Sequence, residues 1–331
     1  MGRVSGLFAV LVLLVLFAGP PGPARGQPVA AGSPMVCRVG VNIEDLYDFD
    51  LTRETFGSVL WLWSLCPSAE PAPLETIVFR TALPGLHLGE VGSTPVDGGG
   101  LYQYRRVQGI FRHDWDVSRY PFDRHRLVIP VDESEFGAAV VVFEADVESS
   151  ALAPEIRSRL EGWEISALEV RASVADQSVD YGLPGEQNVG YARLEADVDL
   201  RRTSRLLAFI KPTLGVFAAA LIAFLAFFLD PREKGTFSTK LGLLVGVLFA
   251  VLLNLRAADA LIGDATRLTL ITEVHLVVVV LIVVIALLAL WEQKRVEREM
   301  PMRHPDRLLL AVTAGLYVLF NLGLIARAVW G

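Results

Sequence analysis

Cysteine and histidine are both scarce in this 331-residue chain, which contains two cysteines and five scattered histidines. Two cysteines alone cannot build a zinc site, and the sequence contains no nucleophile and base pair, metal cluster or phosphate-binding loop. With a net charge of −7 and no basic stripe, the chain also lacks the positive surface that nucleic acid binding requires. These absences exclude nucleic acid as a partner and predict a protein that is not an enzyme and needs no metal or cofactor.

Long apolar runs are also missing from residues 36–203, which alternate instead between apolar and polar side chains in stretches rich in Val, Tyr, Phe and Trp. Alternation with a period of two predicts β-strands, and connections rich in Gly, Pro and Asp separate them. Strands are predicted at residues 39–47, 55–63, 101–111, 127–130, 138–144, 162–171 and 189–200. Seven or more such strands predict an immunoglobulin-like β-sandwich for this domain.

The N-terminus has the composition of a secretory signal. Arg3 precedes an apolar run from Leu7 to Ala18, and prolines and small residues follow up to Gly26. This pattern predicts a signal peptide over residues 1–26, with an uncleaved anchor helix as the alternative. The β domain then lies outside the cell or in the periplasm, where a disulfide can persist.

A hairpin is predicted around the polar turn from Asp48 to Glu54. In an antiparallel hairpin about this turn, residues whose numbers add to about 103 lie opposite each other, and Cys37 and Cys66 meet this condition. A disulfide between them is therefore predicted. The alternative is a pair of buried free thiols, because a slip of one residue would spoil the geometry.

Residues 204–331 consist largely of four apolar segments. Spans are predicted at about residues 204–229, 240–262, 268–291 and 308–329, each close to the length that a ~30 Å hydrocarbon core requires. Positive residues are concentrated in the first and third connections, which the positive-inside rule assigns to the cytoplasm. The sequence therefore predicts an all-α four-helix transmembrane domain in the cell (inner) membrane, with the β domain on the extracellular or periplasmic side.

The secreted β-sandwich, the four helices and the loop Tyr120-Pro-Phe-Asp123 together resemble the pentameric ligand-gated ion channels, the Cys-loop receptor superfamily. Gly162-Trp163 and Pro212 agree with this resemblance. His113 and Leu127 stand where the family has its signature cysteines, and the short connection between the third and fourth spans leaves no room for an intracellular domain, as in prokaryotic members.

The resemblance implies a homopentamer in a lipid bilayer, with a pore for small ions that opens when the outer domain binds a small molecule or protons. A non-conducting membrane-anchored sensor or binding protein of the same fold is the alternative. An aromatic pocket between subunits would suit an organic cation, although the tryptophan of this set could equally be an ordinary strand residue. The candidate ligand residues are Trp61, Phe136, Tyr181 and Tyr191.

Three segments are expected to meet between the two domains, namely the hairpin turn, the loop with Tyr-Pro-Phe-Asp and the strand that leads into the first helix. The resemblance implies that Arg205 pairs there with acids of the other two segments, at roughly 1.5–3 kcal/mol per charge-assisted hydrogen bond. The alternative is that the arginines contact lipid headgroups and the aromatic residues anchor at the interface. The predicted coupling residues are Asp48, Asp50, Pro121, Phe122, Asp123 and Arg205.

The second span is the predicted pore helix. With Lys240 at the basic cytoplasmic-end position that the resemblance implies, the pore-lining residues are Lys240, Gly242, Gly246, Phe249, Leu253 and Arg256. Phe249 and Leu253 would form an apolar constriction that gates by dewetting. Counting from Pro212 instead gives Thr239, Leu243, Gly246, Ala250 and Asn254, and in a third interpretation the glycines serve helix packing.

Charges near this helix leave its ion selectivity open. Rings of Lys240 and Arg256 would favour anions, while Glu233, Asp259 and Asp264 are near enough to reverse that preference. In the third span, Glu273 and His275 are either a proton sensor or a pair exposed at the outer interface.

Overall fold

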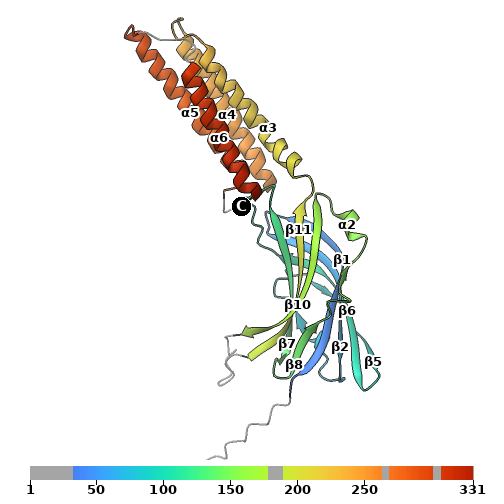
Figure 1. The fold of residues 1–331 in the computed structure, drawn as a ribbon. Helices are drawn as coiled ribbons and strands as arrows, with labels where there is room; N and C mark the ends of the chain where they lie inside the picture. The colour runs from blue at the N-terminus through green and yellow to red at the C-terminus, as the bar shows by residue number, and fades with distance from the viewer. Residues whose placement is uncertain (1–32, 178–188, 263–267, 301–306, 331) are drawn as a thin grey trace, which may run out of the picture.

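The computed structural model describes residues 33–177, 189–262, 268–300 and 307–330. A two-sheet β domain is followed by four long helices, which confirms the predicted fold class. The β domain lies at one end of the helices, and the C-terminal end of the last helix returns to that end (Figure 1). The predicted signal peptide and the candidate ligand residue Tyr181 lie outside the described residues.

The larger sheet has seven strands in the order β4-β6-β2-β1-β8, with β5 paired to β6 and β9 paired to β1. Its long strands contain the alternating segments that the sequence marks. The strands of this sheet are β1 (Met35–Asp50), β2 (Thr55–Cys66), β4 (His87–Leu88), β5 (Gly92–Val96), β6 (Gly100–Arg112), β8 (Val141–Ala145) and β9 (Ala151–Leu152).

The smaller sheet has four strands in the order β10-β11-β7-β3. These strands are β3 (Ile77–Val78), β7 (Arg124–Gly137), β10 (Trp163–Gln177) and β11 (Val189–Arg202), and two short helices, η1 (Pro73–Glu75) and α2 (Ile156–Arg159), lie in the connections. The two sheets share one apolar core, because alternate residues of each strand point inward. Its fully buried members include Leu60, Leu62, Ile129, Leu194 and Leu200.

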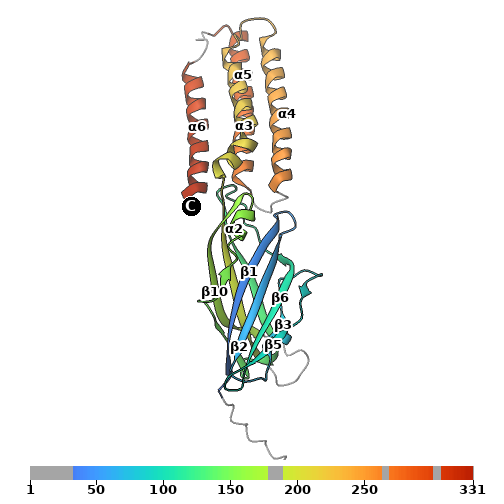
Figure 2. The same cartoon turned by 90° about the vertical axis from the view of Figure 1, so that its right-hand side faces the viewer.

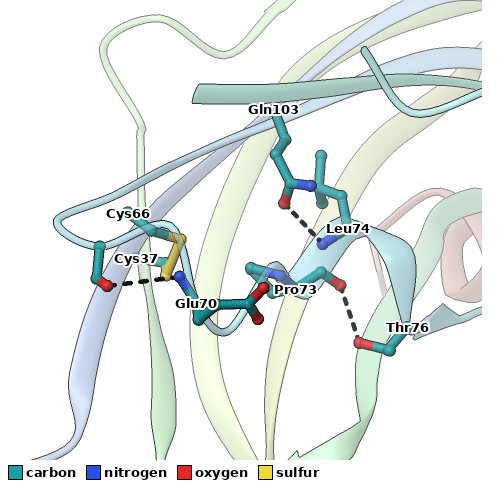
Figure 3. The surroundings of a disulfide bond; sticks show 8 residues. Cys37, Cys66, Glu70, Pro73, Leu74, Thr76 and Gln103 are labelled. Carbon is teal, nitrogen blue, oxygen red and sulfur yellow. Dashed lines mark hydrogen bonds between the residues drawn. A yellow bond between two sulfur atoms is a disulfide. The ribbon is translucent and has the colours of Figure 1, made fainter. Parts of the chain in front are cut away.

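The hairpin of β1 and β2 has the expected register over its outer half. Arg38 pairs with Leu65 and Ile43 with Leu60, and the register shifts between Ile43 and Asp45. Cys37 and Cys66 form a disulfide with their Cα atoms 4.4 Å apart, next to the turn that holds Pro73 (Figure 3). The bond closes the end of the hairpin away from the helices, since β1 begins at that end (Figure 1).

The helices are α3 (Arg205–Phe224), extended by η2 (Leu225–Phe228), α4 (Thr236–Ile262), α5 (Leu270–Glu297) and α6 (Arg307–Trp330). All four are long and apolar enough to cross a membrane, which indicates a multi-pass membrane protein. Helix α4 packs against α3 and α5, and α6 packs against α5. Figure 2 shows α4 and α6 on opposite sides of the layer formed by α3 and α5.

Candidate functional site

A buried carboxylate lies at the junction of the β domain and the helices. Asp123 ends the loop between β6 and β7 and is only 2% exposed. Its Oδ2 accepts a hydrogen bond of 2.6 Å from Nε2 of His125, and its Oδ1 accepts one of 2.9 Å from Nε of Arg202. Burial opposes ionisation, but these donors and the charge of Arg202 outweigh it and hold the pKa of Asp123 below its usual range. The junction therefore contains a stable buried ion pair.

Aromatic rings enclose the cation of this pair. The guanidinium carbon of Arg202 lies 4.5 Å from the ring centroid of Tyr120 and 4.2 Å from that of Trp163. Each such contact adds about 0.5–2 kcal/mol of cation–π attraction. Trp163 lies directly opposite Arg202 in the β10–β11 register, so both side chains point to the same face of the sheet. We call Tyr120, Asp123, His125, Trp163 and Arg202 the junction cluster.

Two further rings back this cluster. Trp115 packs against His125 at 4.8 Å and against His113 at 4.6 Å between ring centroids. Burial, reinforced by the neighbouring imidazole of His125, lowers the pKa of His113 to about 4, so its ring is neutral at pH 7. The position at which the resemblance expects a cysteine thus holds a packed aromatic ring.

The loop that carries Asp123 contacts two helices directly. The carbonyl of Ser118 accepts a hydrogen bond of 3.2 Å from the backbone N–H of Leu270, at the start of α5. The ring of Phe122 lies 6.1 Å from that of Phe209 in α3, and Pro121 beside it is buried. A displacement of this loop would therefore be felt by both α3 and α5.

The predicted pairing of Arg205 is wrong. Asp123 pairs with Arg202, because Val198, Leu200 and Arg202 alternate on the inward face of β11, whereas Arg205 already belongs to α3. Arg205 instead lines a cavity of about 400 Å³ beside the end of α6, together with Arg119, Arg124 and Trp330.

The hairpin turn does not supply the expected acidic partners either. Asp50 accepts a hydrogen bond of 2.6 Å from Nε of Arg53 in the same turn. Hydrogen bonds from the backbone and side chain of Arg53 lower the pKa of Asp50. Asp48, with a φ of 48°, lines a cavity of about 650 Å³ with Glu54 and Arg112. Asp50 is thus engaged within the turn, as short-range turn chemistry favours, while Asp48 and Glu54 face the cavity.

One face of α4, called the free face below, is exposed in the described part of the chain. Gly242, Gly246, Phe249, Leu253 and Arg256 are all exposed, and a Cβ added to either glycine would meet nothing within 4 Å. These are five of the six predicted pore-lining residues. The opposite face packs on α3 and α5 through Leu244, Val247, Val251 and Ala258. Close packing inside the chain therefore does not explain the two glycines.

The predicted position of Lys240 on the pore-lining face of α4 is wrong. Its Nζ lies 2.6 Å from Oε2 of Glu292 in α5, and the two side chains are 3% and 4% exposed. Lys240 lies two residues before Gly242, which at about 100° per residue turns it toward the bundle. It therefore cannot present its charge on the face of Phe249.

The alternative register requires Asn254 to line the pore, and its contacts disagree. The Asn254 side chain is hydrogen-bonded to Nε2 of His275 in α5 at 2.7 Å. His275 is fully buried and its Nδ1 also bonds the carbonyl of Ile271. Glu273 pairs with Arg327 of α6. Of the alternative set, Thr239, Gly246 and Ala250 are exposed like Phe249, and Asn254 is the member that contacts α5 instead; His275 is not exposed at the outer interface.

The candidate ligand residues lie on different sheets. Trp61 is in β2 and donates from its Nε1 to Glu44 at 2.9 Å. Phe136 is in β7, and Tyr191 is in β11 opposite Gly137. Because the first sheet carries Trp61 and the second carries the other two, a shared pocket would have to form between two copies of the chain.

Comparison of the chain with protein-family models and with curated proteins found no match. The functional assignment therefore depends on the junction cluster and on the free face of α4. Sequence reasoning missed His125 and Glu292, and it placed Arg202 at the junction without selecting it as the partner of Asp123. The inward alternation of β11 signals Arg202. His125 is in β7, two residues after Asp123 at the end of the preceding loop, and this spacing signals a shared face; no local pattern signals Glu292.

Proposed function

We propose that this chain is a subunit of a homopentameric ligand-gated ion channel, in which binding or protonation at the β domain opens a pore lined by α4. The junction cluster is the observation that supports this proposal. Asp123 ties the loop between β6 and β7 to Arg202, the last residue of the strand that runs into α3, and the same loop bonds the start of α5. A rearrangement of the β domain can therefore reach the ends of α3 and α5 through the junction cluster and its loop.

The packing of the helices gives the coupling its mechanical basis. Both α3 and α5 pack against α4, so a shift of either helix displaces the proposed pore helix. A ligand can move such an equilibrium only by contacts that differ between the closed and open states. We propose the contacts of the junction cluster with the helix ends as those that differ.

The free face of α4 supports its role in a pore. Five copies arranged with this face toward a common axis would bring five Phe249 rings together and form an apolar neck. Helix α6, which has only a small share of its surface buried, would then face the bilayer on the far side of α3 and α5. A pentamer with α4 around the central axis and α6 against the lipid accounts for the exposed face of α4 and for the exposed surface of α6.

The remaining assignments follow from this arrangement. The β domain lies on the periplasmic or extracellular side of the cell (inner) membrane, small ions permeate, and no enzymatic step is involved. The agonist is a small molecule or a proton. Trp61 of one subunit with Phe136 and Tyr191 of the next is the proposed ligand-binding box for a small cation, by cation–π attraction.

The rival function is a non-conducting membrane-anchored sensor with the same junction. Two measurements on the purified full-length protein separate them. A particle mass of five subunits in detergent and unitary currents in a planar bilayer, evoked by pH or candidate agonists, are the expected results. Monomeric particles that remain silent in the bilayer would contradict the channel and favour the sensor.

A further inference from the structure

The charge at the inner end of α4 is cancelled within the chain. Lys240 and Glu292 form an ion pair of 2.6 Å that is almost completely buried. A buried pair of opposite charges has no net charge and contributes little field beyond its immediate surroundings. The positive charge of Lys240 is therefore neutralised by Glu292 and does not attract anions in the proposed pore.

Arg256 has the opposite environment. It is exposed at the outer end of α4, and among the described residues no carboxylate lies within ion-pair distance of its guanidinium. Gly242, Phe249 and Arg256 are spaced by two helical turns and so point in nearly the same direction. The charge of Arg256 therefore belongs to the face that is proposed to line the pore.

The acid nearest to Arg256 in the described part of the chain does not share this position. Asp259 is half-buried and follows Arg256 by three residues, which places it beyond the outer end of this face and about 60° around the helix from Arg256. Toward the inner end, the free face continues to Gly242 and the exposed hydroxyl residue Ser238. From Ser238 to Arg256 this face contains one cation and no carboxylate.

We infer that the pore selects anions, with chloride and similar small anions as the permeating class. The inference rests on the proposed channel function. In a pentamer the face of α4 from Ser238 to Arg256 would present a ring of five Arg256 guanidinium groups and no ring of carboxylates, and rings of charged side chains determine which sign of ion enters a pore. The connection before α4 contains Asp230, Arg232, Glu233 and Lys234, whose charges sum to zero, so it does not offset the charge of the Arg256 ring.

The test is the reversal potential of the full-length protein in a planar bilayer under a tenfold KCl gradient. Ideal anion selectivity places it at the chloride equilibrium potential, about 59 mV from zero. Arg256→Gln should move the reversal potential toward zero, and Arg256→Glu should move it further toward the potassium side. A cation-selective reversal potential in the unmodified channel would overturn the inference while leaving the channel function intact.

Two control variants separate the ring from other charges. The double variant Lys240→Met and Glu292→Met replaces an ion pair of zero net charge by two uncharged side chains, so the reversal potential should stay unchanged. Arg38→Gln removes one exposed arginine at the distant end of β1 and should also leave it unchanged. If either variant shifts the potential as much as Arg256→Gln does, Arg256 is not the selecting group. Absence of current from the unmodified chain and from Phe249→Ser would overturn the channel assignment itself.

Discussion

The substitution Arg202→Gln tests the junction cluster most directly. It leaves the Asp123 carboxylate buried and without its cation, and it removes the two cation–π contacts with Tyr120 and Trp163. Breaking a buried pair by deleting one partner costs about 3–5 kcal/mol. Because His125 still donates to Asp123, we expect about 3 kcal/mol, the lower end of this range. For a domain of this size that amounts to a decrease in Tm of roughly 6–12 °C.

The neighbouring residue supplies a matched control. Arg201 carries the same charge one position earlier, but it points outward and pairs with Glu164 at 2.8 Å, with both side chains about half exposed. Exposed pairs contribute about 0–1 kcal/mol, so Arg201→Gln should change the unfolding midpoint very little. The contrast between the two variants isolates the effect of burial from that of charge.

The assay is denaturant or thermal unfolding of the full-length protein in detergent, followed by tryptophan fluorescence. Trp163 belongs to the junction cluster and Trp115 packs against it, so the fluorescence of both residues reports the loss of the cluster. A double-mutant cycle with Asp123→Asn should return a coupling energy above about 1 kcal/mol, as expected for residues in contact. Equal midpoints for Arg202→Gln and Arg201→Gln would refute the assignment of Arg202 as the buried partner.

Three further predictions concern the gate, the disulfide and the pH dependence. Phe249→Ser should wet the proposed neck and produce leak current, and leak from Ala250→Ser alone would contradict the outward position of Phe249. Replacing Cys37 and Cys66 by Ala should lower the free energy of unfolding by about 2–4 kcal/mol, and a matched loss on reduction of the unmodified protein checks that the bond is the cause. His113 has a folded pKa of about 4, below its unfolded value, so between these values the unfolded state binds more protons and stability falls as the pH decreases; His113→Phe should flatten this dependence of Tm on pH.

Local geometry decided which contacts could be predicted from the sequence. The hairpin of β1 and β2 has a short polar turn, so its register follows from residue numbers and brings Cys37 and Cys66 opposite each other. The four spans could be predicted because the length of an apolar run reports directly on membrane thickness. In both cases the prediction depends only on residues within one continuous segment of the sequence.

The arginine at the junction was mispredicted because Arg205 was selected by the family resemblance and not by the alternation of side chains along the strand. Val198 and Leu200 are buried, and the alternation of β11 continues to Arg202 before the strand ends. The alternation of inward and outward side chains along β11 assigns Arg202 to the inward face and Arg201 to the outward face. Asp50 was mispredicted for a related reason, since an acid three residues before Arg53 in a turn is satisfied locally before it can reach another segment.

The rotation of α4 could not be predicted from its own sequence, because the helix is apolar on every side. Two polar contacts with α5 determine the rotation instead. Lys240 bonds Glu292 near one end and Asn254 bonds His275 near the other. Any rotation that turned Phe249 inward would move Lys240 out of its pair and expose an uncompensated charge at membrane depth, at a cost of several kcal/mol. The buried polar residues of α4 therefore determine which apolar residues are left on its free face, which is the face proposed to line a pore.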